Sequence, residues 1–511
     1  MISIVNSFGL DGINGYVVTV EADVGNGMPM FEIVGLPDAA VKESRQRVKS
    51  ALKNSHIDLP AKKYIVNLAP ADMKKEGAVY DVPIAIGVIS SLGLVKFNNL
   101  SECMFLGELS LTGEIRKVKG VLPAAICAKQ NGIKNIFVPA ENAGEAAMVE
   151  DINVFPCFNI KDIIMHFTME SEIKPLKIDS AEYFDIIPGS EYDFADVKGQ
   201  ENVKRALEIA AAGGHNCLLI GSPGTGKTML AKRLPTILPD LTLEEALEIT
   251  KIHSVAGILP NNVPIITSRP FRSPHHTIST VALSGGGSIP RPGEVSLAHH
   301  GVLFLDEFPE YKKEAIEVLR QPLEDGTVTV SRVQSTMTYP CNFMLVAAMN
   351  PCKCGYYGDP NHECTCTEHQ INQYLSRISG PVLDRIDLHI EINPVKYDDL
   401  DDKSATEKSA DIKKRVNEAR TIQRKRFEND SIFSNSQMSR QQISKYCSLG
   451  TQESLLLKGA FERLGLSARA YDRILKVART IADLDKSEDI KTVHIAEAIQ
   501  YRNLDRKYWS R

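Results

Sequence analysis

The stretch CLLIGSPGTGKTMLAKRL, residues 217–234, decides the fold of the central part of this chain. Its first four residues form a short apolar run typical of a buried strand, and a glycine-rich turn and a helical pattern follow. Residues 221–228 match the spacing G-x-x-x-x-G-K-[ST] at every position. Such a turn aims backbone N–H groups at a phosphate, at the N-terminus of the next helix. The stretch therefore predicts a phosphate-binding loop in an α/β fold.

This loop predicts a role for each of its residues. Lys227 should reach the β- and γ-phosphates of ATP, and the Thr228 hydroxyl should ligate Mg²⁺. A fortuitous glycine turn is the alternative, and the strand before it and the helix after it argue against that. The residues expected to bind the nucleotide are Gly221, Ser222, Pro223, Gly224, Thr225, Gly226, Lys227 and Thr228.

A second apolar run, GVLFLDEF at 301–308, ends in an acidic pair. Ligands bind at the carboxyl ends of strands in open α/β sheets, which is where Asp306 and Glu307 should lie. We expect Asp306 to hold Mg²⁺ and Glu307 to polarise the attacking water. Such a pair can also cap the next helix, but the complete phosphate loop upstream favours the catalytic interpretation.

Two further strands carry candidate residues near their ends. FMLVAAMN (343–350) ends at Asn350, which could orient the water or the γ-phosphate, or simply start the turn before the next proline. SGPVLDRIDLHIEI (379–392) places Arg385 between two acids, where an isolated arginine is usually solvated or ion-paired.

The order of these four motifs resembles that of an AAA+ ATPase. RPFRSPHHTIST, GGGSIPRPGEVSLAHHGVLFLDEFPE and LRQPLEDGTVTVSR resemble its magnesium-chelatase-like branch, and the whole chain resembles the ComM/YifB family. The resemblance implies that Asn350 is the sensor 1 residue and that Arg385 is an arginine finger for the neighbouring subunit's ATP. It also implies that Arg469, in LGLSARAYDRILKVARTIADL, is the sensor 2 residue. A finger acting in trans implies a ring, and the family implies a hexamer.

The resemblance also predicts two loops that contact a substrate. One is an insert within about 252–290, which includes SGGGS, and the other is a hairpin arm at GTVTVSR, 326–332. Arg291 and Arg332 could contact a phosphodiester backbone, or pair with nearby acids. Residues 412–427 form a basic helical stretch that either binds DNA phosphates or is a solvated face, and no interleaved aromatic residues favour base stacking.

The N-terminal region resembles the Lon-protease catalytic domain. The likeness runs through KKEGAVYDVPIAIGVISSLG (74–93) and GELSLTGEIRKVKGVLPAAICAKQNGIKNIFVPAEN (107–142). The position of the proteolytic serine falls on Val79 and that of the lysine on Leu122, and neither can act as nucleophile or base. No serine lies between Ala61 and Ile89, so a small alignment slip restores no nucleophile. We expect a Lon-like fold that is not a peptidase.

These segments predict an α/β protein of three domains. The expected parts are an N-terminal Lon-protease-like (S5-type) α/β domain at 1–168, a linker at 169–192, a central AAA+ P-loop α/β domain at 193–395, a connector at 396–410 and a C-terminal helical lid domain at 411–511. The chain has 511 residues and a net charge of −5, so DNA contact must come from a local basic surface. No signal peptide or membrane span is visible and most cysteines are scattered singly, so we expect a cytoplasmic protein.

NPCKCGYYGDPNHECTC, residues 350–366, holds four of the ten cysteines. Cys352, Cys354, Cys364 and Cys366 have the spacing C-x-C-x9-C-x-C, and four thiolates suit tetrahedral Zn²⁺. The C-x-C pairs are tighter than those of zinc ribbons, His362 or His369 could replace one ligand, and four reduced thiols are the alternative. With Lys353 as its one basic residue, the loop is too short to be a DNA finger, so we expect a metal clip within the ATPase.

Together these features predict a hexameric AAA+ ATPase that moves on single-stranded or branched DNA. The resemblance implies a helicase that promotes branch migration in recombination or natural transformation. The alternative is a chelatase-type motor that remodels a partner protein for metal insertion into a tetrapyrrole, and an ATP-dependent protease is disfavoured by Val79 and Leu122. The pairs His275–His276 and His299–His300 are expected to pack and hydrogen-bond near the core, because adjacent residues in extended chain point to opposite sides.

Overall fold

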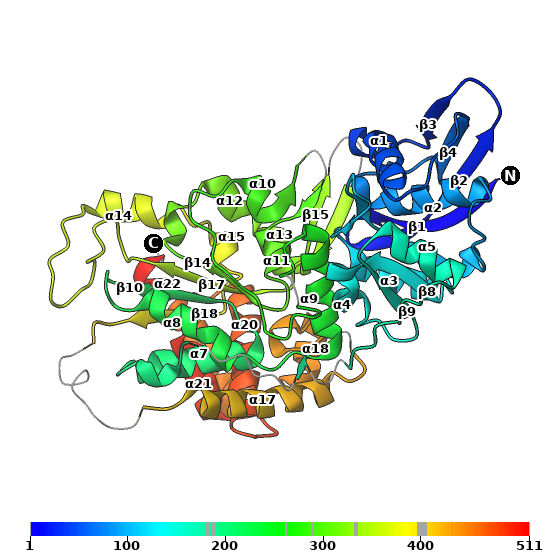
Figure 1. The fold of residues 1–511 in the computed structure, drawn as a ribbon. Helices are drawn as coiled ribbons and strands as arrows, with labels where there is room; N and C mark the ends of the chain where they lie inside the picture. The colour runs from blue at the N-terminus through cyan, green and yellow to red at the C-terminus, as the bar shows by residue number, and fades with distance from the viewer. Residues whose placement is uncertain are drawn as a thin grey trace. The chain divides into compact units, whose positions relative to one another are not determined.

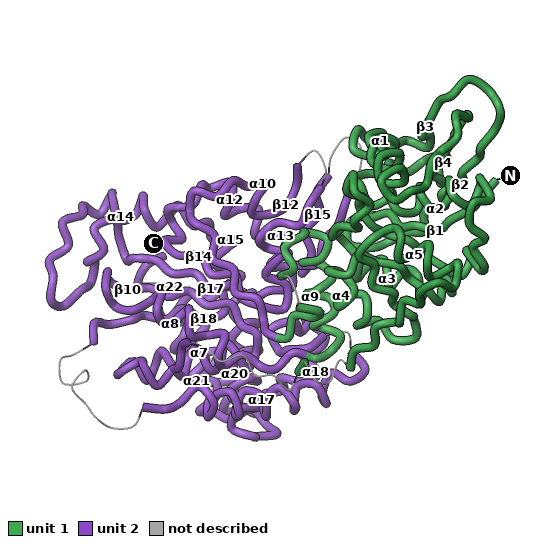
Figure 2. Tube along the Cα trace, in the orientation of Figure 1, with its two compact units in different colours: residues 1–187, 242–267 green, residues 188–241, 268–511 purple. Residues whose placement is uncertain are grey.

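The structure, a computed structural model, describes residues 2–179, 183–184, 191–260, 263–287, 290–331, 336–395, 406–430 and 432–509 (Figure 1). The chain forms two compact units. Unit 1 comprises residues 1–187 and 242–267, and unit 2 comprises residues 188–241 and 268–511 (Figure 2).

Unit 1 is built on a mixed seven-stranded sheet in the order β3-β4-β2-β1-β5-β8-β9. The strands are β1 (Ser3–Asp11), β2 (Asn14–Gly25), β3 (Met30–Val34), β4 (Lys63–Ala69), β5 (Cys103–Phe105), β8 (Asn135–Pro139) and β9 (Asn153–Cys157). Strand β2 runs antiparallel to both of its neighbours, and the remaining pairs are parallel. A short ribbon joins β6 (Glu108–Leu109) and β7 (Ile115–Arg116).

Helices pack around this sheet and share its hydrophobic cores. They are α1 (Ala39–Asn54), α2 (Asp81–Ser91), α3 (Val121–Gln130), α4 (Ala143–Ala146), α5 (Ile160–Thr168) and α9 (Leu243–Ala256). Helix α2 is buried along almost its whole length, as its apolar sequence VPIAIGVI predicts. The expected N-terminal α/β domain is therefore present as a mixed-sheet unit.

Helix α9 comes from the middle of the chain, yet it packs in unit 1. The Ser254 hydroxyl donates a hydrogen bond to Glu145 Oε2 (2.5 Å), and the Ser254 carbonyl accepts one from the Gly120 N–H (3.2 Å). Burial raises the pKa of the Glu145 carboxyl, although hydrogen bonds from Ser254 and Asn142 oppose the rise. Residues 242–267 therefore belong to unit 1 in space, although they lie within the sequence range of the predicted central domain.

Unit 2 is built on a five-stranded parallel sheet in the order β11-β14-β17-β10-β18. Its strands are β10 (Cys217–Gly221), β11 (Phe271–Arg272), β14 (Val302–Leu305), β17 (Met344–Met349) and β18 (Leu388–Ile392). Every residue of β10, β14 and β17 is buried, which explains why their sequences are continuous apolar runs. The predicted parallel sheet is confirmed.

Along the chain, the described helices of unit 2 lie before, between and after the strands of this sheet. They are α7 (Glu201–Gly213), α8 (Lys227–Arg233), α10 (Thr280–Ser284), α11 (Glu294–Leu297), α12 (Lys313–Val318), α13 (Arg320–Asp325), α14 (Glu368–Leu375), α15 (Gly380–Leu383), α17 (Ser409–Arg426), α18 (Arg440–Tyr446), α19 (Thr451–Leu464), α20 (Ala468–Leu484), α21 (Thr492–Gln500) and α22 (Asn503–Tyr508). The C-terminal region is helical, as predicted. Its helices share one hydrophobic core with the sheet, which joins Leu219 of β10 to Val416 of α17 and Ile481 of α20.

Two short hairpins also belong to unit 2. Strand β12 (Gly285–Gly286) pairs with β13 (Arg291–Pro292), and β15 (Thr327–Ser331) pairs with β16 (Thr336–Pro340). The second confirms the hairpin predicted at 326–332. The buried Tyr339 donates a hydrogen bond from its hydroxyl to the Pro290 carbonyl (2.9 Å), which ties the two hairpins together. Arg291 is exposed, and Arg332 lies outside the described residues.

None of the helices that the structure describes combines the length and hydropathy needed to cross a bilayer.

Candidate nucleotide site and cysteine cluster

Three neighbouring strands of unit 2 end at one edge of the sheet. Ile220 of β10 lies beside Met349 of β17, and Ala347 of the same strand lies beside Leu305 of β14. Since the strands are parallel, the segments that follow them emerge together. The phosphate loop, Asn350 and the acidic pair Asp306–Glu307 therefore converge, although up to 130 residues of sequence separate them.

The phosphate loop connects β10 to α8 and has the geometry its glycines allow. Gly224 and Gly226 have φ angles of 81° and 88°, a left-handed region that favours glycine. Helix α8 begins at Lys227, so its unpaired N–H groups lie at the loop. The loop residues thus fit the phosphates of a nucleotide.

Lys227 lies over the loop and links it to the next strand. Its Nζ donates hydrogen bonds to the Gly221 carbonyl (2.6 Å), the Ser222 carbonyl (2.9 Å) and Asn350 Oδ1 (3.0 Å). Burial lowers the pKa of Lys227, and the negative charge of Asp306 opposes this. The structure therefore brings together Lys227 and Asn350, as expected from the strand end that carries Asn350 and from the family resemblance.

Thr228 and Asp306 form the oxygen pair expected at a Mg²⁺ site. Thr228 Oγ1 donates to Asp306 Oδ2 (2.7 Å), and Asp306 Oδ1 accepts the N–H of Glu307 (2.9 Å). Hydroxyl and carboxylate oxygens suit Mg²⁺, which is bound through few protein ligands together with substrate phosphates. These two residues fit such an ion beside the phosphate loop.

Glu307 stands just beyond this pair with a strained backbone and an exposed carboxylate. Its φ is 51°, a conformation that is uncommon for a residue other than glycine. Its Oε2 lies 3.1 Å from His276 Nδ1, in the segment that follows β11. The sequence predicted hydrogen bonding near the core for the His275–His276 pair, but not this partner. Only the strand order, which puts β11 beside β14, reveals it.

The two arginines predicted from the family resemblance lie elsewhere in unit 2. Arg385 is buried, forms an ion pair with Glu324 and donates to the Pro381 carbonyl (2.6 Å). Its Nε has no acceptor among the described residues. Arg469 is exposed, and its Nη1 lies 3.7 Å from Asp384 Oδ2. Within the described residues, neither side chain is hydrogen-bonded to the phosphate loop.

A buried polar network, missed by the sequence analysis, joins β18 to α20. Asp387, two residues after Arg385, is fully buried and pairs with Arg473 and with His215 Nδ1 (3.1 Å). His215 Nε2 lies 2.8 Å from Thr480 Oγ1. Burial alone would raise the pKa of Asp387, but the Arg473 charge and the His215 hydrogen bond hold it well below its usual range. The network fixes the helix that carries Arg469.

Most of the basic residues of α17 have partners inside unit 2. Lys413 pairs with Asp240, Arg415 with Glu208 and Glu407, and Arg426 with Asp483. Arg420 donates to two backbone carbonyls. These contacts leave fewer basic side chains of the stretch 412–427 free for DNA phosphates, and they also differ from the solvated face that was the alternative.

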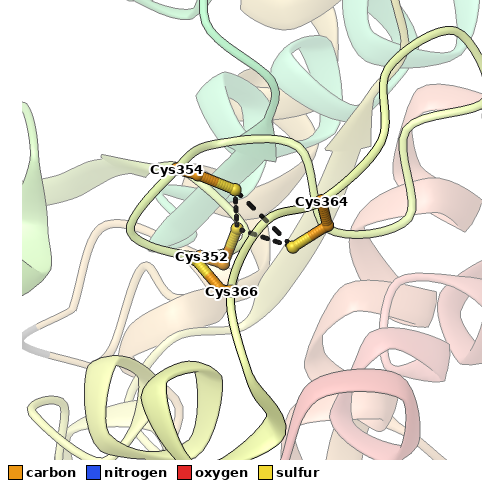
Figure 3. A group of neighbouring side chains, drawn as sticks. All are labelled: Cys352, Cys354, Cys364 and Cys366. Carbon is orange, nitrogen blue, oxygen red and sulfur yellow. Dashed lines mark hydrogen bonds between the residues drawn. The ribbon is translucent and has the colours of Figure 1, made fainter.

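The four cysteines of residues 352–366 gather around one point (Figure 3). Cys352 Sγ lies 3.3 Å from Cys354 Sγ and 3.7 Å from Cys364 Sγ. The sulfur atoms of Cys354 and Cys364 are 3.6 Å apart. Cys366 completes a group in which all four sulfur atoms lie within 4.8 Å of one another. The sequence predicted this clustering, and the spacing of the thiols suits a tetrahedral ion.

In unit 1, the two positions that resemble the Lon dyad hold apolar side chains in one core. Leu122 of α3 is fully buried, and Val79 packs against the cluster that contains it. Val79 lies just before α2, and its carbonyl accepts the Gly107 N–H (3.1 Å). At these positions the described structure offers packing and no group that could take a proton.

Comparison with known proteins finds relatives over almost the whole chain. Residues 20–142 match the family described as subunit ChlI of Mg-chelatase, residues 193–400 match magnesium chelatase, subunit ChlI, and residues 406–502 match its C-terminal region. YifB of Salmonella typhimurium is 43% identical over 512 residues, with 99% of this chain and 98% of the relative covered. Competence protein ComM of Haemophilus influenzae is 42% identical over 510 residues, with the same coverage.

This chain belongs to the YifB/ComM family. The family resemblance seen in the sequence is confirmed, and the parallel-sheet part of the chain is a ChlI-type ATPase domain. The Magnesium-chelatase 38 kDa subunit of Rhodobacter capsulatus is a more distant relative, 26% identical over 176 residues and 31% of this chain. The YifB and ComM relatives are similar over 99% of this chain and therefore over both units, whereas this chelatase subunit is similar over 31% of the chain.

Proposed function

We propose that this protein is a ring-forming AAA+ ATPase that couples ATP hydrolysis to movement on DNA. The observation that carries the proposal is the contact of Lys227 Nζ with Asn350 Oδ1 at 3.0 Å, beside the Thr228–Asp306 pair at 2.7 Å. Phosphate-binding, metal-binding and water-orienting groups thus stand at three adjacent strand ends, which is the arrangement phosphoryl transfer requires.

Each residue then has one task in ATP hydrolysis. The loop N–H groups and Lys227 bind the phosphates, and Thr228 and Asp306 would hold Mg²⁺, which would supply positive charge to neutralise the phosphates. Glu307 accepts a proton from the attacking water, and Asn350 orients the water or the γ-phosphate. His276 positions the Glu307 carboxylate.

The strand order of unit 2 supports the assignment to the AAA+ ATPases. Numbered in chain order, the strands of unit 2 lie in the order 2-3-4-1-5, and the strand before the phosphate loop lies between the strand that precedes Asn350 and the strand that follows Arg385. We assign this sheet to the AAA+ class and the C-terminal helices to its lid. Unit 1 is assigned a Lon-protease-like fold without peptidase activity, because Val79 and Leu122 replace the dyad.

The proposal includes a homo-oligomeric ring, a hexamer by family resemblance, in which Arg385 serves the ATP of a neighbouring subunit. Such a role requires Arg385 to leave Glu324, since it is buried and paired within its own chain. Arg469 is already exposed and can move to the γ-phosphate with the lid. Neutralising charge on the transferred phosphoryl group is worth on the order of 10³-fold or more in rate.

DNA is proposed as the substrate on two grounds. A relative similar over almost the whole chain is named competence protein ComM. The hairpins β12–β13 and β15–β16 carry exposed polar residues, including Arg291, whose charge suits a phosphate backbone. We therefore propose a helicase that promotes branch migration in recombination or natural transformation, acting in the cytoplasm.

The test is unwinding of forked DNA by the full-length protein with ATP. Wild type should separate the strands, Lys227→Ala should not, and Lys232→Ala, an exposed lysine on the same helix, should behave as wild type. Arg291→Ala should weaken DNA binding and reduce its salt dependence while leaving ATP binding intact. ATP turnover without any effect of or on DNA would reject the DNA part of the proposal.

A chelatase-type motor is the second candidate, favoured by the match of residues 193–400 to magnesium chelatase, subunit ChlI. The likeness to two chelatase subunits covers 31% and 43% of this chain, against 99% for the competence protein relative. Stimulation of ATP turnover by a chelatase partner with a tetrapyrrole, and not by DNA, would favour it.

A further inference from the structure

Residues 351–366 form a long loop without helix or strand between β17 and α14. Loops of this length within a compact domain are uncommon unless they are functional or held by a cross-link. Four cysteines fall within it, and all ten cysteines of the chain are free thiols, so no disulfide holds the loop. Neither the hydrogen bonds of a helix or strand nor a disulfide holds this loop in its conformation, so another interaction has to do so.

The arrangement of the four sulfur atoms indicates a metal ion. A tetrahedral Zn²⁺ site with Zn–S bonds of about 2.3 Å has sulfur–sulfur edges of about 3.8 Å. The sulfur–sulfur distances of 3.3, 3.7 and 3.6 Å among Cys352, Cys354 and Cys364 are close to this value. Cys352 is buried, whereas the other three are partly exposed, so an ion can enter from solvent.

The same loop rests on the phosphate loop of unit 2. The Ser222 hydroxyl donates a hydrogen bond to Asp359 Oδ2, and Asp359 Oδ1 accepts the N–H groups of Asn361 (2.8 Å) and His362 (3.1 Å). Gly355, with φ of 92°, approaches Pro223 so closely that a Cβ there would lie 2.6 Å from Pro223 Cδ. Two residues of the cysteine loop thus touch two residues of the nucleotide site.

We propose that Cys352, Cys354, Cys364 and Cys366 bind one structural Zn²⁺ and that this zinc loop braces the phosphate loop through Asp359 and Gly355. The ion fixes the turn that presents Gly355 to Pro223 and the return segment that follows Asp359. Because the loop leaves β17 directly after Asn350, the same ion also limits the motion of the residue that contacts Lys227. The inference rests on the proposed nucleotide site.

Zinc and nucleotide are therefore coupled ligands. A phosphate loop held in shape by the zinc loop binds nucleotide more tightly, and bound nucleotide in turn slows zinc loss, since coupling between two sites is reciprocal. A cross-link that only stabilised the fold at a distance from Ser222 and Pro223 would show no such reciprocity.

The test combines metal analysis with nucleotide binding on the full-length protein purified under reducing conditions. Zinc should be present at about one ion per chain and absent from Cys364→Ser, while Cys447→Ala, which removes a buried thiol outside the cluster, should retain it. Replacement by Co²⁺ should give the absorption of a tetrahedral thiolate site. No metal, or iron in place of zinc, would overturn the assignment.

Asp359→Ala separates the brace from the metal. It should keep zinc and weaken binding of a fluorescent ATP analogue by about 3- to 10-fold, the range for one lost hydrogen bond. Cys364→Ser should weaken binding at least as much, and the double variant should add little, because both changes break one linkage. Chelation of the wild-type ion gives the same readout without a substitution. Unchanged affinity after zinc loss would overturn the brace.

Failure of this inference and failure of the proposed function are distinguishable. Zinc content and nucleotide affinity are measured without DNA and without turnover. A protein that binds zinc and couples it to nucleotide, but neither responds to DNA nor acts on it, would reject the proposed function alone.

Discussion

Each unit places a loop before a helix, and the two positions have opposite chemistry. In unit 2, the start of α8 presents Lys227 to Asn350 and to the loop carbonyls. In unit 1, Val79 before α2 packs with the core that contains Leu122. Both are α/β units, so the fold class alone does not distinguish them. The polar groups that converge on one strand edge make the nucleotide site, and their absence from the positions of Val79 and Leu122 leaves a core.

The largest effect is expected for Lys227→Ala. Removing this charge from the phosphates should reduce ATP turnover on the order of 10³-fold or more, because its stabilisation grows as charge moves onto the transferred group. Steady-state ATP hydrolysis measures this, with Lys232→Ala as the matched control on α8. Turnover within tenfold of wild type would mean that unit 2 does not use the site described.

Glu307→Gln should separate turnover from binding. Without a carboxylate to accept the proton of the attacking water, turnover should fall by about 10²–10³-fold. Nucleotide affinity should stay close to wild type, because Thr228 and Asp306 remain. Glu310→Gln, an exposed acid three residues later, is the control and should change neither quantity appreciably.

Leu122→Ala tests whether the position in unit 1 that resembles the Lon lysine is part of the hydrophobic core. Truncating this fully buried side chain should lower the free energy of unfolding of unit 1 by about 2–5 kcal/mol. Leu111→Ala, at a position 56% exposed, should lower it by no more than about 0.5 kcal/mol. Denaturant unfolding reports both values. A tolerated Leu122→Ala would contradict the interpretation of this position as core.

His276→Ala should have a smaller, purely catalytic effect. Its ring holds the carboxylate of Glu307, so its loss should reduce turnover by about tenfold through poorer orientation, with nucleotide affinity unchanged. His275→Ala, whose ring contacts Thr277, should leave turnover near wild type. Equal effects of the two substitutions would remove His276 from the site.

The smallest effect concerns acid stability of the Asp387 network. The pKa of Asp387 is depressed, so its contribution to stability is present above the unfolded value of about 4 and is lost as the pH falls below it. Unfolding followed from pH 6 to pH 2 should therefore show a steeper loss in wild type than in Asp387→Asn. Parallel curves would show that Asp387 does not titrate with folding.

Much of the nucleotide site could be predicted from the sequence, for a physical reason. Parallel strands buried on both faces are continuous apolar runs, and residues directly after them must emerge at one edge. Residues 221–228, Asp306, Glu307 and Asn350 all follow such runs, and the structure brings them together. The four cysteines were likewise predicted because their spacing is local.

What escaped prediction depends on contacts between distant segments. His276 meets Glu307 only because β11 lies beside β14, and Asp359 meets Ser222 across 137 residues of sequence. Helix α9 carries ordinary helical periodicity, and nothing in it indicates that Ser254 bonds to Glu145, 109 residues earlier in the sequence, within unit 1. The role of Arg385 was predicted from the family resemblance, and its sequence context allowed an ion pair but gave no indication that the partner would be Glu324.

The most direct test of the central claim is ATP turnover of the full-length wild-type protein with and without forked DNA. If ATP hydrolysis drives movement on DNA, DNA should raise turnover and the rise should weaken steeply with salt. Glu307→Gln should abolish the rise while still binding nucleotide. Turnover that is lost in Glu307→Gln but identical with and without DNA at every salt concentration would contradict the claim that this ATPase works on DNA.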